Sequence, residues 1–259
     1  MEPEQLVAGC AQSVGLEREQ NEDALFCLSS VLAGDKQAQA FGLYIVADGM
    51  GGHRNGEIAS SYSVRAFSSV LIERLSRPLF GPQAGLPQES LQEIVVGALT
   101  EAHRVVNEEA SGGGTTFTAA LVIGEQLITA HIGDSRLYLI SPEGETKVLT
   151  RDHSFVNRLV ELGQITSEEA AVHPQRNVLY RALGQGEPLE ADVSAAYLPH
   201  GGKLLLCSDG LWGVVPDQEI SNIVQANAEP SVACQKLVDA ANNAGGPDNI
   251  SVILVRLPD

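Results

Sequence analysis

The alternation of apolar and polar residues is clearest between Phe41 and Leu75. An apolar run, Phe41 to Ala47, ends in Asp48 and then in a glycine-rich turn. Such a run with Tyr, Ile and Val is typical of a strand buried on both faces. The apolar residues that follow recur at helical spacing: Ile58, Tyr62, Ala66 and Val70, with Phe67, Leu71 and Leu75 beside them. We therefore predict a buried strand that carries Asp48 at its C-terminal end, followed by an amphipathic helix over about 55–76.

The Asp48-Gly49 dipeptide has a second local interpretation, because Asp-Gly is also a hairpin signal. A hairpin needs a second strand, whereas the residues that follow have helical spacing. The strand-to-helix interpretation is therefore favoured, and the hairpin stays open on local grounds.

The remaining pattern falls into blocks of strands and blocks of helices. We predict strands at 5–11, 24–28, 115–123, 127–132, 136–140, 191–197, 203–207 and 250–257, and helices at 88–110, 216–226 and 230–244. The short links within 115–140 predict antiparallel neighbours. A polar stretch at about 150–186 predicts a flap over the sheet edge. The blocks indicate an α+β fold, in which the two long helices cover the outer faces of stacked antiparallel sheets.

Acidic residues stand at the ends of several predicted strands. Besides Asp48, they are Glu22, Asp23, Asp134, Asp209 and Asp248. Taken singly, Asp134 and Asp248 suit turns equally well, and Glu22-Asp23 suits a solvated loop. Because turns do not require an acid repeatedly at strand ends, we predict that these carboxylates converge on one point.

Converging carboxylates need compensating charge. A pair about 4 Å apart repels by roughly 4 kcal/mol at an effective dielectric constant near 20. Oxygen ligands without His or Cys spacing favour Mg²⁺ or Mn²⁺, then Ca²⁺, and disfavour zinc. Two such ions sharing a carboxylate can activate a water for in-line attack on phosphorus. Arg18 either holds the phosphoryl group or forms a surface ion pair with Glu17 or Glu22.

Composition narrows the class of protein. The chain has 259 residues and a formal net charge of −17, which argues against nucleic acid or an anionic membrane as partner. We expect no signal peptide, because the first residues lack a basic and an apolar region, and no apolar run of about 20 residues occurs. The cysteines form no C-x-x-C pair and have apolar neighbours: Cys10, Cys27, Cys207 and Cys234. We predict reduced core cysteines in a cytoplasmic protein.

A set of motifs gives a more specific indication. In order, they are Arg18-x-x-Asn21-Glu22-Asp23, Val46-Ala-Asp-Gly-Met-Gly-Gly-His53, Gly114-Thr-Thr116, Gly133-Asp-Ser-Arg136, Asp152-His-Ser154, Leu206-Cys-Ser-Asp-Gly-Leu211 and Gly246-Pro-Asp-Asn249. The chain resembles bacterial-type metal-dependent serine/threonine protein phosphatases of the type 2C (PPM) family. The resemblance implies an α-β-β-α sandwich, formed by a single catalytic domain over 1–259 with a flap at about 150–186. It also implies one-step hydrolysis of phosphoserine and phosphothreonine by water activated at two Mn²⁺ or Mg²⁺ ions.

The resemblance also implies a role for each candidate residue. Asp48 would bridge both ions and the Gly49 carbonyl would bind one of them. Asp209 and Asp248 would complete the first site. Glu22 would serve the second, with Asp23 acting directly or through water, and Asp134 with Asp209 would hold a third, weaker ion. Arg18 would bind substrate phosphate and Asn249 would support the Asp248 loop, while the flap would take part in substrate choice.

The identity of the general acid stays open. Met50 stands where eukaryotic members of the family carry the proposed acid histidine, and His53 comes three residues later. His53, another histidine or a metal-bound water fits the role, and His53 fits a structural role at the helix start equally well. Ser13 also departs from the family pattern, which has Asp there, with little effect expected. Trp212 is expected to pack in the core or at a rim rather than to contact substrate.

Phosphorylated Ser/Thr proteins are the expected substrates, with a partner Ser/Thr kinase in a signalling system, and the chain is expected to be a monomer. Two other functions stay open. One is a non-catalytic module of the same fold that binds phosphoproteins. The other is a phosphatase of small phosphorylated metabolites.

Overall fold

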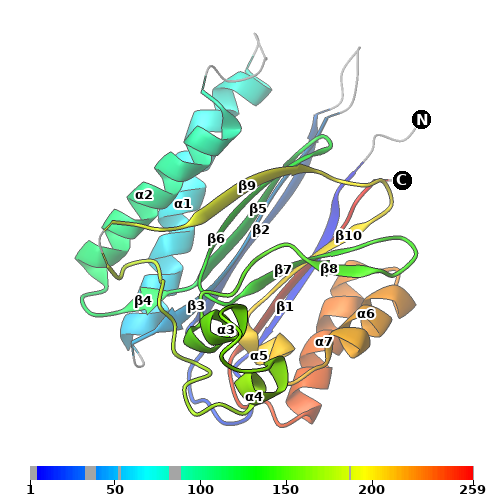
Figure 1. Cartoon of the computed structure of the whole chain (residues 1–259). Coiled ribbons are helices and arrows are strands. Elements are labelled where there is room, and N and C mark those ends of the chain that lie inside the picture. The colour runs from blue at the N-terminus through cyan, green and yellow to red at the C-terminus, as the bar shows by residue number, and fades with distance from the viewer. Residues whose placement is uncertain (1–4, 33–38, 52–53, 82–88, 187, 259) are drawn as a thin grey trace.

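The computed structural model describes residues 5–32, 39–51, 54–81, 89–186 and 188–258. Two antiparallel sheets face each other, and helices cover their outer faces (Figure 1). One sheet has the order β1-β11-β10-β7-β8, formed by Val7–Ser13, Ile250–Arg256, Lys203–Cys207, Arg136–Ile140 and Thr146–Val148. The other has the order β2-β3-β5-β6-β9, formed by Asp23–Leu32, Gln39–Met50, Phe117–Ile123, Gln126–Ile132 and Asp192–Tyr197, with β4 (Gly114–Thr115) also paired to β3.

Different helices cover the two sheets. The long helices α1 (Arg54–Phe80) and α2 (Leu91–Glu109) pack on the β2-β3-β5-β6-β9 sheet. The helices α6 (Asp217–Ala226) and α7 (Pro230–Asn243) pack on the other sheet. The predicted α-β-β-α sandwich is therefore confirmed. The expectation that the two long helices cover both outer faces is wrong, because they lie side by side on one sheet and the C-terminal helices cover the other.

Strand β3 lies at the centre of the core, as its apolar run predicts. Residues 41–47 are buried throughout. Leu43 and Ile45 point into the layer of α1 and α2, whereas Tyr44 and Val46 point into the layer between the sheets. Since both faces of β3 are covered, its end forms a rigid support for Asp48.

The helix after β3 packs on the sheet with most of the apolar face that its sequence predicts. Phe67, Leu71 and Leu75 are almost fully buried, but Tyr62 is 41% exposed. Ile58, Ala66 and Val70 of the predicted stripe are partly buried against the same core, so Tyr62 is the member of the stripe that departs from the prediction. The helix also continues past the predicted end, with Pro78 in its last turn.

Three other expectations need correction. Strands β6 and β7 are not neighbours, because the three-residue link at Gly133 passes from one sheet to the other. The short edge strand β8 follows no strong sequence pattern and was not predicted. Cys10 is exposed rather than in the core, since it lies on the edge strand β1, whereas Cys207 and Cys234 are buried. Across the part of the chain that the structure describes, no helix is long and apolar enough to cross a membrane.

The polar stretch from 150 to 186 holds two short helices, α3 (Phe155–Glu161) and α4 (Ser167–Ala171). A single bridge between Thr115 and Leu183 joins it to the sheet, and a second bridge, between Ser154 and Leu179, lies within the stretch itself. In Figure 1, α3 and α4 lie beside α5 (Asp209–Trp212), the short helix that follows β10. The stretch therefore lies at the end of the sandwich where several strands terminate.

The central position of β3 predicts the energetic effect of truncating its side chains. Ile45→Ala should lower the free energy of unfolding by about 2–5 kcal/mol, because a fully buried side chain is replaced by a cavity. Val232→Ala on α7, where the side chain is 46% exposed, should change it by less than about 0.5 kcal/mol. Urea unfolding followed by circular dichroism measures both. Equal losses in the two variants would contradict the assignment of β3 to the core.

Candidate metal centre

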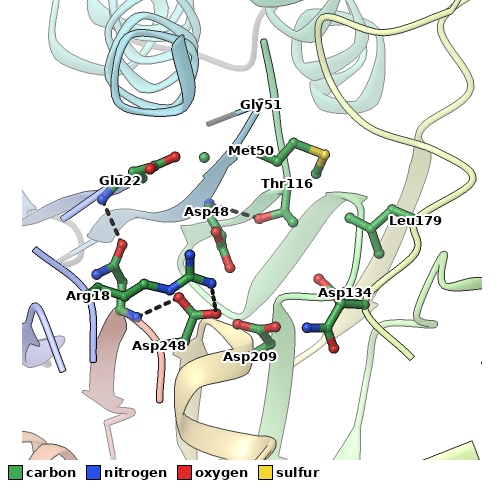
Figure 2. Close-up of a pocket in the computed structure, with 13 residues that line it drawn as sticks. Arg18, Glu22, Asp48, Met50, Gly51, Thr116, Asp134, Leu179, Asp209 and Asp248 are labelled. Carbon is green, nitrogen blue, oxygen red and sulfur yellow. Dashed lines mark hydrogen bonds and ion pairs between the residues drawn. The ribbon is translucent and has the colours of Figure 1, made fainter. Parts of the chain in front are cut away.

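The acidic strand ends meet in one pocket of about 240 Å³ (Figure 2). Asp48 comes from β3, Asp209 follows β10, Asp248 precedes β11, and Asp134 lies in the link between β6 and β7. The lining residues are Arg18, Glu22, Asp48, Gly49, Met50, Gly51, Thr116, Asp134, Asn177, Leu179, Asp209, Asp248 and Asn249. We call this space the acidic pocket. Segments that lie far apart in the sequence thus place their carboxylates around one point.

Asp48 is held by its own backbone. Its N–H donates to Thr116 Oγ1 at 2.9 Å, and its carbonyl accepts from the Thr116 N–H at 2.8 Å and from Thr115 Oγ1 at 2.9 Å. The carboxylate takes part in none of these bonds. Its backbone is therefore fixed without use of its carboxylate, which lines the pocket.

Gly49 occupies a position that admits no side chain. Its N–H donates to the Glu22 carbonyl at 3.1 Å. A Cβ atom on this residue would lie 2.2 Å from the Gly56 carbonyl oxygen and 2.6 Å from that of Glu22. Because both contacts are to backbone, the glycine is required for β2, β3 and the start of α1 to meet here.

Asn249 joins the Asp248 loop to the loop that carries Glu22. Its Oδ1 accepts from the Glu22 N–H at 2.8 Å, and its Nδ2 donates to the carbonyls of Val14 and Gln20, each at 2.9 Å. Its own N–H donates to Asp248 Oδ1 at 2.8 Å. One side chain thus sets the positions of two carboxylates from opposite ends of the sequence.

The Asp134 loop is held by the residues around it. Trp212 Nε1 donates to the Asp134 carbonyl at 3.0 Å, and the Arg136 guanidinium stacks on the Trp212 ring at 3.7 Å. Arg136 also pairs with Asp152 at 2.8 Å. Trp212 therefore packs at the rim of the site, as expected. The Asp134 carboxylate is buried beside these contacts.

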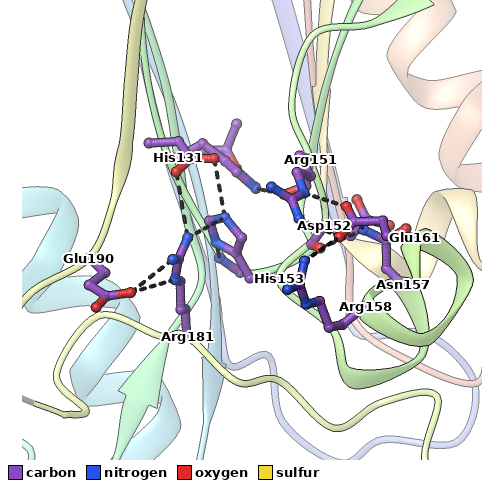
Figure 3. A network of polar contacts seen from close by, with 12 residues as sticks. His131, Arg151, Asp152, His153, Asn157, Arg158, Glu161, Arg181 and Glu190 are labelled. Carbon is purple, nitrogen blue, oxygen red and sulfur yellow. Dashed lines mark hydrogen bonds and ion pairs between the residues drawn. The ribbon is translucent and has the colours of Figure 1, made fainter.

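A histidine pair connects this loop to the flap (Figure 3). The Gly133 N–H donates to His153 Nδ1 at 3.1 Å, and the His153 N–H donates to the Gly133 carbonyl at 2.7 Å. His131 lies next to His153, with ring centroids 5.0 Å apart, and its Nε2 is 3.0 Å from the Arg151 carbonyl. Burial lowers the pKa of His131 to about 4, so this imidazole is neutral at pH 7. Through these hydrogen bonds, the uncharged imidazoles link β6 and the Asp134 loop to the flap.

Arg18 lies at the mouth of the acidic pocket. Its Nη2 pairs with Asp248 Oδ2 at 2.7 Å, and its side chain is 52% exposed. Its partner is thus a carboxylate of the pocket, rather than Glu17 or Glu22 as the surface alternative proposed. The guanidinium is the cation that faces the pocket among its described lining residues.

The acidic pocket disfavours the ionised form of its own carboxylates. Burial raises the pKa of Asp23 to about 7 and that of Asp209 to about 6, and nearby carboxylates add to both effects. Burial and neighbouring carboxylates also hold the pKa values of Asp48 and Asp134 well above their usual range. Asp48 and Asp209 keep partial solvent contact through the pocket, but protein surrounds them elsewhere. Ionising these buried carboxylates costs free energy, which bound cations would offset.

Two buried carboxylate oxygens without hydrogen-bond partners indicate whether cations suit the acidic pocket. Oδ1 of Asp23 and Oδ1 of Asp209 are buried and have no hydrogen-bond partner. Such atoms are rare in folded proteins unless an ion or water supplies the partner. Among the described residues, no three His, Cys, Asp or Glu side chains are placed to hold a metal ion as they stand. The donor set is nonetheless chemically suited to hard divalent cations, because its ligands are carboxylate oxygens.

The residues that the sequence proposes for the site do not all line the acidic pocket. Seven of them line the acidic pocket: Arg18, Glu22, Asp48, Gly49, Asp134, Asp209 and Asp248. Asp23 lies behind its wall, where Asp23 Oδ2 accepts from Ser208 Oγ at 2.9 Å. His53 lies outside the described residues. Sequence reasoning assigned no role to Asn177 or Leu179, which reach the pocket from the flap, where no local pattern marks them.

Because the pKa of Asp209 is raised, its ionised carboxylate should lower the stability of the folded chain when no cation is bound. With chelator at pH 8, Asp209→Asn should raise the melting temperature by a few degrees, because 1 kcal/mol corresponds to about 2–4 °C in a chain of this size. The pKa of Asp209 is about 6 in the folded state and 3.8, its ordinary value, in the unfolded state. The advantage of the variant should therefore shrink as the pH falls from about 6 towards 4.

Asp239→Asn on the exposed face of α7 is the matched control and should leave the melting temperature nearly unchanged. Scanning calorimetry measures both variants against the native chain. A destabilised Asp209→Asn chain at pH 8 would show that its carboxylate is satisfied without a cation.

Comparison with known proteins places this geometry in a family. The Protein phosphatase 2C family profile matches residues 9–250. The protein phosphatase PhpP of Streptococcus pneumoniae is 39% identical over 221 residues, which cover 83% of this chain and 85% of the relative. The serine/threonine phosphatase PstP/Ppp of Mycobacterium tuberculosis has a TM-score of 0.77 and 36% identity, and the match covers 98% of this chain and 100% of that one.

A further solved structure holds metal. The catalytic domain of the serine/threonine protein phosphatase PstP in complex with two manganese ions has a TM-score of 0.78 and 33% identity, with 99% of this chain and 100% of that chain covered. The sequence, the fold and the acidic pocket agree with one assignment. The chain belongs to the protein phosphatase 2C family.

Proposed function

We propose that this chain hydrolyses phosphoserine and phosphothreonine in protein substrates in one step, with water as the nucleophile and divalent cations as cofactors. The observation that carries the proposal is the convergence of buried carboxylates with unpartnered oxygens in one pocket. The two manganese ions in the related PstP structure support Mn²⁺ as the cofactor, with Mg²⁺ as the alternative.

The chain's own residues would hold two cations. Asp48 projects between the other carboxylates (Figure 2) and would bridge both ions. The carbonyl of Gly49, which also lines the pocket, would bind one of them. Asp209 and Asp248 would complete one site, whereas Glu22, with Asp23 behind it, would serve the other. Asp134 with Asp209 would hold a third, weaker ion. When bound, the cations would offset the carboxylate charge and favour deprotonation of a nearby water.

Arg18 would bind the substrate phosphate. In this structure its guanidinium pairs with Asp248. A cation held by Asp248 would weaken that ion pair, and the exposed guanidinium would then be free to donate to two phosphate oxygens as a fork. Arg18 would thereby orient the phosphoryl group and offset charge that develops on it. Protonation of the leaving oxygen by His53 stays a prediction, because His53 lies outside the described residues.

The proposal also covers the domain organisation, cellular location and partners of the chain. We propose one catalytic domain over 1–259, with 150–186 as a flap whose residues Asn177 and Leu179 reach the pocket. We propose that the chain acts in the cytoplasm as a monomer, opposite a Ser/Thr kinase in a signalling system. The two sheets share one apolar layer, which supports a single folding unit.

Turnover tests the proposal. The native chain with added Mn²⁺ should hydrolyse p-nitrophenyl phosphate and a phosphothreonine peptide, and chelator should abolish both activities. Asp209→Asn should lower kcat by at least about 100-fold, because the cation loses a charged ligand. Asp239→Asn should retain full activity. Release of p-nitrophenol and of inorganic phosphate measures the rates.

The outcomes separate the functions that the sequence leaves open. No turnover of either substrate by a folded chain in Mn²⁺ or Mg²⁺ would contradict the proposal and favour a phosphoprotein-binding module. Hydrolysis of small phosphate esters without hydrolysis of phosphopeptides would favour metabolites as substrates.

A further inference from the structure

The backbone turns sharply at Gly133, directly before Asp134. Gly133 has a φ of 106°, in the left-handed region that favours glycine. A Cβ atom on it would lie 2.6 Å from both Cβ and Cγ2 of Thr116. The Oγ1 of Thr116 in turn accepts from the Asp48 N–H at 2.9 Å. The contact between Gly133 and Thr116 therefore sets how closely the Asp134 loop approaches the end of β3.

His153 holds both backbone polar groups of Gly133. The Gly133 N–H donates to His153 Nδ1 at 3.1 Å, and the Gly133 carbonyl accepts from the His153 N–H at 2.7 Å. Gly133 and His153 are both buried. Loss of the imidazole would thus leave a buried N–H without its acceptor, at the position where the chain turns towards the acidic pocket.

A carboxylate on strand β9 orients the His153 ring. The bond from Gly133 requires a lone pair on Nδ1, and burial lowers the pKa of His153, so the neutral ring carries its proton on Nε2. The Nε2–H then donates to Asp192 Oδ2 at 3.3 Å. Arg181 lies 3.4 Å from the same nitrogen (Figure 3), but in this tautomer it pairs instead with the carboxylates of Glu190 and Asp192.

We propose that His153, oriented by Asp192, is a positioning residue for Asp134 and sets the place at which Asp134 can share a cation with Asp209. Neither His153 nor Asp192 lines the acidic pocket, so both would act through the backbone of Gly133. The proposal rests on the proposed function, in which Asp134 and Asp209 hold the weaker ion. Groups that orient metal ligands from outside typically change metal affinity by about 10- to 100-fold when they are removed.

Mn²⁺ binding to the full chain tests the proposal without reference to activity. Free Mn²⁺ gives an EPR signal that is lost on binding, so a titration reports each class of site. The native chain should bind two ions tightly and one weakly. His153→Leu should weaken the weak site about tenfold and leave the two tight sites unchanged. An unchanged weak site in His153→Leu, or its absence from the native chain, would overturn the proposal.

Rescue by a conservative variant distinguishes positioning from simple packing. The Oδ1 of an asparagine can take the place of the His153 Nδ1 and accept from the Gly133 N–H. His153→Asn should therefore keep the weak-site affinity within about threefold of the native value. A loss as large as that in His153→Leu would contradict the assigned hydrogen bond and overturn the proposal.

The exposed end of the arrangement gives a test that does not disturb the core. Asp192 is half exposed, and Asp192→Ala removes the acceptor of the His153 Nε2–H. This variant should weaken the weak site about threefold or more. Glu190→Ala is the matched control, because it removes a carboxylate partner of Arg181 without touching His153. Equal weak-site affinities in the two variants would overturn the proposal.

A double-mutant cycle shows whether His153 acts through Asp134. With saturating Mn²⁺ and a phosphothreonine peptide, His153→Leu should lower kcat in the native chain. In the Asp134→Asn background the same change should lower kcat by less than about twofold, because its target is already lost. Equal losses in both backgrounds would overturn the proposal.

The native chain separates the two possible failures. A native chain that binds no Mn²⁺ and hydrolyses neither p-nitrophenyl phosphate nor the peptide would overturn the proposed function itself. Two tight ions and normal turnover, together with a weak site that is indifferent to His153 and Asp192, would overturn only the positioning role.

Discussion

The repulsion among carboxylates at one end of the sandwich is the constraint on which the site depends. Asp48, Asp134 and Asp209 are enclosed by protein and by one another, and the pKa of each is raised. A fold that assembles such a cluster loses stability unless cations offset the charge. The cluster is therefore explained by the cations that it would bind, because without them it lowers the stability of the folded chain.

The rest of the structure keeps these acids in place despite their repulsion. Strand β3 is covered on both faces, so the end that carries Asp48 cannot move freely. Gly49 allows three backbone segments to meet, and Asn249 joins the loops of Asp248 and Glu22. Trp212 and the histidine pair hold the Asp134 loop from the side of the flap. Most of these contacts use backbone atoms or uncharged side chains, and the one carboxylate oxygen among them is Asp248 Oδ1, which accepts from the Asn249 N–H.

Local pattern predicted the central parts of the fold well. The apolar run of β3 identified a buried strand, and acids at strand ends identified most of the acidic pocket, because rigid strands deliver their ends to defined positions. The pattern did not predict that β7 leaves the sheet of β6, since a three-residue link suits a hairpin as well as a crossing. It also gave no role to Asn177 or Leu179, whose positions depend on how the flap folds back. Tertiary packing also decided where the buried face of α1 ends, and Tyr62 lies outside that face.

Anomalous X-ray scattering from crystals grown with Mn²⁺ tests the central claim most directly. Data collected at the manganese absorption edge locate the ions without reference to activity. The account predicts two strong peaks in the acidic pocket, with Asp48 between them and Arg18 turned away from Asp248. An acidic pocket without a peak at saturating Mn²⁺, with the carboxylates and Arg18 placed as in this structure, would contradict it.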